Sequence, residues 1–567
     1  MSTKIKRRKF IKNSIQTAVL LGLGGSQIFF QKSSRSKEID ILILKGLVFD
    51  GQGTPPQEAD IAIKGNKIYR VTTNINPDKA KRIINARGLA IAPGFIDAHS
   101  HTDVGLLVNP RAESQVRQGV TTEISGNCGF SPFPISDAVF SEYHKYYKEE
   151  YDIKLDWRDI NGFFKRLGEK GIALNYATLL GHGNLRGEVV GYYDRPPTEK
   201  EIRRMRKKIR ENLNSGALGM SSGLEYAPGS YADTRELIEL CHEVARFRGI
   251  YATHMRDEGD KLLESMEEAI QISKKTGVSL QISHLKVAYQ RNWPKIDDAI
   301  TKIESAAKEG INILADRYPY VAGSTGLSYF FPLWSKQGIT KEFIARLKDP
   351  NLDSKIRNHL KEQEKKLGSW DKVLISSVFT EKNKTFEGKN ILEAAGEIRK
   401  EPYEFIRDLL IEEENRVAMI LFFASEENLK RILAHPLVVI GADGEAVAPY
   451  GLLGKGKPHP RYYGTFTRIL GRYARNEKIF SLGQAIKKMT SLTAQKFGLK
   501  HRGQIKENYF ADVVIFNPDK VSDQATWEKP KQYPLGIEWV VVNGKIIIQN
   551  GEHTGSLPGR ILKKSTV

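Results

Sequence analysis

Cysteine is nearly absent from this chain of 567 residues, in which only Cys128 and Cys241 occur. Two cysteines could form one disulfide at most, so the fold does not rest on a disulfide framework of the kind found in small secreted domains. Long apolar runs are missing too, since none approaches the roughly 20 residues that a membrane-spanning helix needs. We therefore expect no stable membrane span in the mature protein, and a chain of this length predicts more than one folding unit.

The chain also lacks the motifs of several common function classes. No Arg-rich arm, zinc-finger spacing or aromatic RNA-reading motif accompanies the formal net charge of +20, so a solvated basic surface explains the charge better than nucleic-acid binding does. No Gly-x-Ser-x-Gly elbow ends a predicted strand, which argues against a serine hydrolase. The glycine-rich stretch 451–457 lacks the strand–loop–helix setting of a phosphate-binding loop.

The first 36 residues resemble an export signal. The basic sequence Lys6-Arg7-Arg8-Lys9 precedes a short, glycine-rich apolar segment at 18–25, as in twin-arginine signals. This pattern predicts engagement of the twin-arginine export machinery and a location in the bacterial periplasm or cell envelope. A basic disordered tail is the alternative interpretation. No clean cleavage site follows, so cleavage near residues 25–36 and retention as an anchor both stay open.

Both ends of the remaining chain have the pattern of short β-strands. Residues 39–44, 60–63 and 67–71 alternate or form apolar runs between glycine turns, and residues 511–516, 537–542 and 546–548 do the same near the C-terminus. Asn543-Gly544 is a favoured two-residue hairpin turn. The pattern predicts one small β-domain, a β-sandwich, assembled from residues 37–90 and 495–567.

Between these ends, residues 91–494 alternate strands with helical stretches, which is typical of the α/β class. Eight candidate strands end near the following positions: His101, Cys128, His182, Leu224, His254, Lys286, Tyr320 and Asp443. Eight such units in sequence favour a distorted TIM-like (β/α)8 barrel, whose active site lies at the carboxyl ends of the strands. The gap from about 328 to 434 is too long for a loop and is rich in Lys and Glu, so it predicts an inserted α-rich subdomain.

Potential metal ligands stand at the ends of these candidate strands. His99 and His101 are two residues apart, so on one strand their imidazoles point the same way and can clamp one ion. His254 and His284 each follow an apolar strand. A single histidine at such a place is more often structural, but two beside an HxH pair favour a metal site.

Two further residues extend this ligand set. Asp443 ends the last candidate strand, where it could bind the metal, take a proton from an attacking water and return it to a leaving nitrogen. Capping of the next helix is the alternative role for this carboxylate. Cys128 ends another strand, and a thiol beside a metal ion is deprotonated; the alternative is an inert buried thiol. The set predicts a zinc-dependent hydrolase.

Longer motifs identify a family. From about Ile39 to Lys563 the chain resembles the amidohydrolase superfamily and, within it, the D-aminoacylase (N-acyl-D-amino-acid deacylase) family. The motifs that carry the resemblance are Gly126–Pro132, Ser221–Gly229, His254–Glu258, Tyr318–Thr325, His459–Phe466 and Gln532–Ile537.

The resemblance implies particular roles. Cys128, His254 and His284 would hold a tightly bound Zn²⁺, with Cys128 in place of the carboxylated lysine of other superfamily members. His99, His101 and Asp443 would form a second, weaker site, with Asp443 as general acid/base. Residues expected to bind the substrate carboxylate or carbonyl are Tyr226, Lys286, Tyr318 and Arg256. Ordinary polar residues at the rim are the alternative.

The expected reaction is hydrolysis of an N-acyl-D-amino acid to a carboxylate and a free D-amino acid. A cyclic-amide hydrolase of the hydantoinase or dihydroorotase type and a D-residue dipeptidase could use the same metal site. A non-catalytic binding protein is a third hypothesis, which the complete ligand set argues against. The insertion at 328–434 and the extra loop 450–457 depart from the family pattern and leave the preferred side chain open.

Overall fold

A nine-stranded sheet joins the two ends of the chain in the computed structural model, which describes residues 38–564. Its order is β21-β20-β19-β18-β5-β1-β2-β3, with β4 paired to β1. Strand β18 is antiparallel to β5 on one side and to β19 on the other, so it connects the two ends. The strands are β1 (Ile39–Val48), β2 (Gln57–Lys64), β3 (Lys67–Thr72), β4 (Ala80–Asn85), β5 (Ala90–Pro93), β18 (Val513–Phe516), β19 (Ile537–Val542), β20 (Lys545–Gln549) and β21 (Glu552–His553).

The predicted hairpin turn is present in this sheet. Asn543 and Gly544 connect β19 to β20 with φ angles of 48° and 76°, the left-handed conformation that a tight hairpin turn requires. A Cβ on Gly544 would approach the carbonyl oxygen of Gly65 to 2.0 Å, so only glycine fits there. The turn therefore packs directly on the turn between β2 and β3.

The centre of the molecule consists of parallel strands in two sheets. One has the order β17-β13-β12-β11-β10-β9 and the other β6-β7-β8. They are continuous through residue 179 between β8 and β9, and at the far edge the amide of Ala98 donates to the carbonyl of Ile440 over 3.2 Å. The strands are β6 (Phe95–Asp97), β7 (Val120–Ser125), β8 (Asn175–Thr178), β9 (Leu180–Gly181), β10 (Gly219–Gly223), β11 (Ile250–His254), β12 (Ser279–Ile282), β13 (Ile313–Arg317) and β17 (Val438–Ile440). The α/β class is confirmed, whereas the closed barrel and the sandwich stay predictions.

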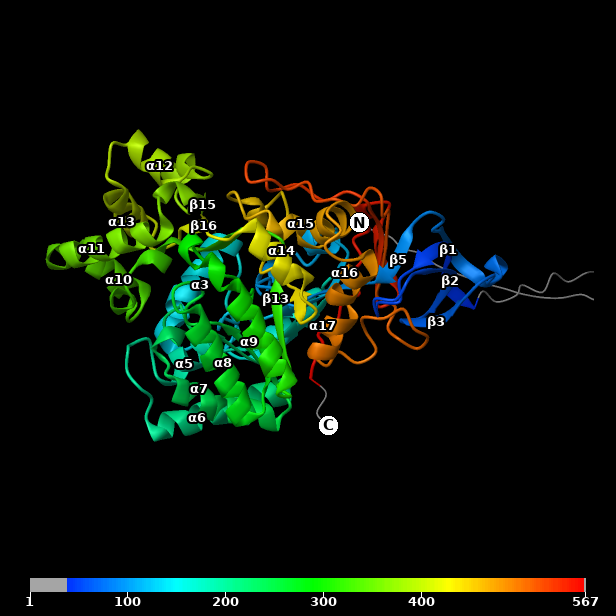
Figure 1. Ribbon diagram of the computed structural model, residues 1–567, viewed down its shortest axis with the longest axis horizontal. Coiled ribbons are helices and arrows are strands. Elements are labelled where there is room, and N and C mark those ends of the chain that lie inside the picture. The colour runs from blue at the N-terminus through cyan, green and yellow to red at the C-terminus, as the bar shows by residue number, and fades with distance from the viewer. Residues whose placement is uncertain (1–37, 565–567) are drawn as a thin grey trace, which may run out of the picture.

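Helices connect these strands and cover them. Helix α6 begins with a capping box between Thr198 and Glu201 and ends at Gly216, and α7 begins at the cap Asp233. Figure 1 shows α5 to α9 gathered along one side. The helices outside residues 322–422 are α1 (Gly105–Val108), α2 (Glu113–Val116), α3 (Asp137–Tyr151), α4 (Ile160–Lys170), α5 (His182–Val189), α6 (Glu199–Ser215), α7 (Thr234–Arg246), α8 (Leu262–Thr276), α9 (Ile296–Lys308), α14 (Glu426–Ala434), α15 (Arg461–Arg468), the π-helix η9 (Ile469–Asn476), α16 (Leu482–Met489) and α17 (Ser491–Lys496).

Residues 322–422, between β13 and α14, have a core of their own. Three antiparallel strands pack with helices around a cluster that includes Phe331, Ile356, Trp370 and Ile406, separate from the main core. Figure 1 shows α10 to α13 projecting from the rest of the molecule. The elements are β14 (Ala322–Gly326), α10 (Thr340–Lys348), α11 (Pro350–Leu367), β15 (Val373–Ser377), α12 (Ile391–Glu397), α13 (Pro402–Glu412) and β16 (Ala418–Phe422). The domain boundaries drawn from the sequence stay predictions.

Two sequence expectations concern the chain's surroundings. The export signal at 1–36 lies outside the described residues. Within residues 38–564, no helix has both the length and the apolar character needed to cross a membrane.

Both cysteines are buried and free, so they form no disulfide with each other.

A buried ion pair fastens the terminal sheet to the parallel strands. Arg502 and Asp512 form a salt bridge, with side chains only 4% and 5% exposed. Asp512 also accepts hydrogen bonds from the amide of Asn543 in the hairpin turn (2.7 Å) and from the side chain of Asn175 on β8 (3.3 Å). One carboxylate thus connects three segments that are far apart in the sequence.

We expect Arg502→Met to lower the free energy of unfolding by about 3–5 kcal/mol, because removing one partner leaves a buried charge without compensation. The matched control is Lys81→Met in the exposed pair with Asp40, which should cost about 1 kcal/mol or less. Urea unfolding followed by tryptophan fluorescence measures both. Equal effects of the two variants would contradict the assigned role.

Candidate metal centre and active site

The predicted ligands come together at the carboxyl ends of the parallel strands. His99 and His101 follow β6, Cys128 follows β7, His254 ends β11, His284 follows β12 and Asp443 follows β17. Cys128, His284 and Asp443 have φ angles of 51°, 35° and 51°, an unfavourable backbone conformation for residues with a Cβ. Each turns the chain sharply at the point where the strand ends.

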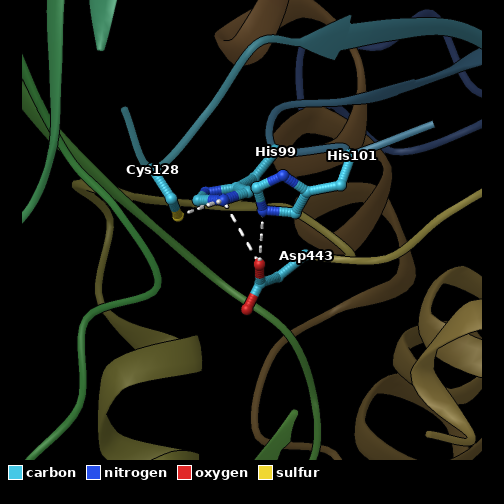
Figure 2. Close-up of side chains that lie close together, drawn as sticks. All are labelled: His99, His101, Cys128 and Asp443. Atoms are coloured by element: carbon cyan, nitrogen blue, oxygen red, sulfur yellow. Dashed lines mark hydrogen bonds and ion pairs between the residues drawn. The ribbon is translucent and has the colours of Figure 1, made fainter. Parts of the chain in front are cut away.

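One group of ligand atoms joins the first and last strands (Figure 2). Nε2 of His99 lies 3.3 Å from Sγ of Cys128 and 3.3 Å from Oδ1 of Asp443. The same oxygen lies 3.1 Å from Nε2 of His101. The ligand atoms of these four residues all lie within 4.8 Å of one another.

A second group shares the thiol. Sγ of Cys128 lies 3.3 Å from Nε2 of His284, which in turn lies 2.9 Å from Nδ1 of His254. Nitrogen and sulfur ligands about 2.0–2.3 Å from a zinc ion are separated from one another by distances of this size. Both groups therefore fit a transition metal ion with nitrogen, sulfur and carboxylate ligands, and Cys128 belongs to both.

Carboxylates orient the imidazoles from behind. Asp316 accepts from Nδ1 of His99 over 3.1 Å and from the amide of His284 over 2.8 Å. Glu258 lies 3.0 Å from Nδ1 of His284 and Glu225 lies 3.0 Å from Nε2 of His254. Such partners fix the tautomer of a ligating histidine and raise its basicity.

The electrostatics of the site favour a bound cation. Burial and the neighbouring Asp443 raise the pKa of the Cys128 thiol well above its usual value, so the thiol stays protonated unless a positive charge lies beside it. Burial and Lys286 lower the pKa of His284 to about 3, which leaves a neutral imidazole. A buried thiol and a neutral imidazole within 3.3 Å of each other are suited to hold a metal ion.

A cavity of about 420 Å³ opens beside these ligands. Three of the predicted substrate residues, Tyr226, Lys286 and Tyr318, line it together with the metal ligands. The phenol of Tyr226 accepts from the hydroxyl of Thr325 over 3.3 Å, and Lys286 donates to Glu258 over 2.5 Å. The inserted segment supplies part of the wall through Gln363, Lys366, Ala418, Leu421 and Phe423.

Arg256 does not line this cavity, and its expected contact with the substrate stays a prediction. Strand β11 ends at His254. The strand alternation that would point the side chains of residues 254 and 256 in the same direction therefore stops before Arg256. The guanidinium instead pairs with Glu268 at 3.0 Å and donates to the carbonyls of Ser230 and Ala232. Arg256 therefore holds the loop after β10 against α8.

Arg461 is a site residue that no sequence pattern indicated. This buried arginine of α15 lines the cavity, with Nη1 2.8 Å from Oδ2 of Asp443. Burial opposes ionisation of Asp443, but Arg461 and His99 outweigh it and hold the pKa of this carboxyl well below its usual range. The motif His459–Phe466 pointed to this segment without showing which side chain enters the site.

We expect Asp316→Asn to weaken metal binding about 10- to 100-fold, because His99 loses the carboxylate that orients it. Competition with a chromophoric chelator measures the affinity. Asp523→Asn, whose carboxylate pairs with Arg468 outside this cavity, is the control and should bind metal as the unmodified chain does. An unchanged affinity in Asp316→Asn would contradict the role of this carboxylate.

Comparisons with known proteins identify the family of the chain. The model of the amidohydrolase family matches residues 82–317 and 404–548. The chain is similar to the D-aminoacylase of Alcaligenes xylosoxydans xylosoxydans, with 35% identity over 94% of this chain and 99% of that protein. It is 32% identical to the N-acyl-D-aspartate deacylase of the same organism, over 93% of this chain and 95% of that protein.

A solved structure has a similar fold. The crystal structure of the N-acyl-D-glutamate deacylase of Bordetella bronchiseptica, complexed with zinc and a phosphonate inhibitor, matches with a TM-score of 0.78 and 29% identity. The match covers 93% of this chain and all of that one. The chain therefore belongs to the amidohydrolase family and, within it, to the D-aminoacylase family.

Proposed function

We propose that this protein is a zinc-dependent hydrolase that cleaves the amide bond of N-acyl-D-amino acids to a carboxylate and a free D-amino acid. The observation that carries the proposal is a nitrogen, sulfur and carboxylate ligand cluster that opens into a cavity with cationic side chains. The names of the relatives, D-aminoacylase and N-acyl-D-aspartate deacylase, support the same reaction.

Cys128, His254 and His284 are the residues proposed to hold the tightly bound zinc, with His99, His101 and Asp443 as a second, weaker position. Zinc supplies a water of lowered pKa and polarises the carbonyl oxygen of the amide. The zinc in the related deacylase structure supports this assignment. Cys128 can serve either position, because its sulfur lies 3.3 Å from both His99 and His284.

Asp443 is proposed to move the proton. Its low pKa makes it a carboxylate at neutral pH, so it can accept a proton from the attacking water. Oδ1 faces His99 and His101, while Arg461 holds Oδ2. The carboxylate is thereby kept in one orientation, from which it returns the proton to the leaving nitrogen.

Lys286, Tyr226, Tyr318 and Arg461 are proposed to bind the α-carboxylate or the carbonyl of the substrate. Nη1 of Arg461 faces Asp443, whereas Nε has no hydrogen-bond acceptor among residues 38–564, so this buried guanidinium can also bond to a ligand. It lies 4.7 Å from the ring of Tyr318, which keeps it in place. A charge-assisted hydrogen bond to a carboxylate suits an open-chain substrate better than a cyclic amide.

The finer architecture and the location belong to this proposal. We infer that the two parallel sheets act as one distorted (β/α)8 barrel, since the hydrogen bond from Ala98 to Ile440 joins their edges. We also propose that the basic pair Arg7-Arg8 directs export by the twin-arginine route to the periplasm or cell envelope. That route carries folded, cofactor-loaded proteins, which suits a metalloenzyme.

Amine release from matched N-acetyl-D- and N-acetyl-L-amino acids tests the reaction. We expect the zinc-loaded protein to hydrolyse the D series alone, and Asp443→Asn to lower kcat by about 100-fold or more, because proton transfer contributes about 10²–10⁴-fold. Asp523→Asn should retain full activity. Zinc-loaded protein that releases amine from neither series would overturn the proposal and favour a cyclic amide or a D-residue dipeptide as substrate.

Charge in the cavity favours D-amino acids with neutral side chains. Its lining has six carboxyl groups, on Glu225, Asp257, Glu258, Asp260, Asp443 and Glu445, but three cationic ones, on Lys286, Lys366 and Arg461. Each cation already has a carboxylate partner, at 2.5, 3.8 and 2.8 Å respectively. The α-carboxylate of a substrate needs one of these cations, so a second carboxylate would lack a partner.

We therefore expect kcat/KM for N-acetyl-D-leucine to exceed that for N-acetyl-D-glutamate by about tenfold or more, since like charges brought together cost several kcal/mol. The measurement compares both substrates at equal ionic strength. Lys366→Met should widen the gap, because Asp260 loses a nearby cation. Equal or faster hydrolysis of the glutamate substrate would contradict this interpretation of the cavity.

A further inference from the structure

A second cavity, of about 380 Å³, adjoins the metal centre. It shares His101, Phe130 and Glu445 with the cavity described above. Because His101 is a ligand candidate and lines both cavities, the two cavities meet beside the metal centre. A scissile amide at the centre therefore has space on both of its sides.

The two cavities differ in charge. The first contains all three cationic groups, Lys286, Lys366 and Arg461. The second has no Lys or Arg among its lining residues and has two carboxyl groups, on Asp103 and Glu445. The half of the substrate that carries the α-carboxylate is drawn to the first cavity, so the acyl half faces the second.

Helix α3 builds the second cavity's wall from tyrosines. Tyr146 and Tyr147 lie three and four residues after Tyr143, and Tyr151 lies four residues after Tyr147, which places the four on one face of the helix. All four are half-buried and line the cavity. The ring centroid of Tyr147 lies 5.7 to 6.3 Å from those of the other three tyrosines, within the range of aromatic contact.

This wall is held firmly in place. The ring of Tyr147 stacks on the buried Trp157, with the ring centroids 5.9 Å apart and an interplanar angle of 20°. The hydroxyls of Tyr146 and Tyr151 lie 3.4 Å apart. A third cavity, of about 460 Å³, continues past Tyr146 and Tyr151. The methyl group of an acetyl substrate would leave most of this space unused.

We propose that the second cavity binds the acyl group of the substrate and that this group is uncharged, aromatic and larger than acetyl. The inference rests on the proposed deacylase function and deepens it. Aromatic faces favour a stacked ring, and the half-buried wall offers the area that makes such a contact favourable. The carboxyl groups of Asp103 and Glu445 disfavour an anionic acyl group.

Three substrates with one amino acid test the proposal: N-acetyl-, N-phenylacetyl- and N-succinyl-D-leucine. We expect kcat/KM for the phenylacetyl substrate to exceed that for the acetyl substrate by about tenfold. The succinyl substrate, with its added carboxylate, should fall below the acetyl substrate by about tenfold. Turnover of acetyl-D-leucine without a gain from phenylacetyl would overturn this inference alone. No turnover of any of the three would overturn the proposed function and the inference with it.

Variants of α3 locate the effect. Tyr146→Ala should reduce the phenylacetyl advantage about fivefold, mainly through KM, while acetyl-D-leucine turnover changes less than about twofold. Tyr146→Phe keeps the ring and should keep the advantage. Tyr69→Ala, which removes an exposed tyrosine of β3, is the matched control and should change neither substrate. Tyr143→Ala provides a second test on the same wall. Equal losses on both substrates in both α3 variants would contradict the assignment of this cavity.

Discussion

The active site depends on a positive charge beyond what its own side chains supply. Imidazoles and a thiol are buried together with the carboxyl groups of Asp97, Asp316 and Asp443. Burial raises the pKa of Asp97 to about 8 and raises the pKa of the Cys128 thiol well above its usual value. A divalent cation among these groups compensates the buried carboxylates and stabilises the thiolate at once. The geometry of the strand ends, the orienting carboxylates and the position of Arg461 all serve that one centre.

Asp97 shows how the fold and the centre are coupled. Its carboxyl group accepts from the amide of His99 over 3.0 Å and from the amide of Ala442 over 2.8 Å. One amide belongs to the ligand candidate His99 after β6, and the other precedes the ligand candidate Asp443 after β17. One buried carboxyl group therefore sets the distance between β6 and β17, and with it the separation of His99 from Asp443. Because buried hydrogen bonds of this kind cost much to break, the ligand geometry is held before any substrate binds.

The ligands could be predicted from the sequence because local patterns carry the information. A short stretch of sequence is enough to show a buried strand, the position where it ends and a pair of histidines two residues apart. Parallel strands then bring their carboxyl ends to one edge of the sheet. Arg256 could not be placed in this way, since its direction depends on where β11 stops and on Glu268 of the next helix. Arg461 lies 18 residues beyond Asp443 in the chain, and only the packing of α15 brings it to that carboxylate. The terminal strands were predictable from alternation and from Asn543-Gly544, whereas their joining through β18 and β5 is a long-range contact that no local pattern contains.

The ligands and the cavity walls come from different kinds of segment. The ligands stand on or directly after parallel strands, whose hydrogen-bonded neighbours restrict their movement. The walls come from α3, from the insertion through Leu421 and Phe423, and from the loops after β11 and β12. A substitution at the strand ends alters a candidate metal ligand, while one on α3 or β16 alters a cavity wall. The walls can therefore change without a change at the strand ends, which is consistent with relatives being named for different D-amino acids, aspartate and glutamate.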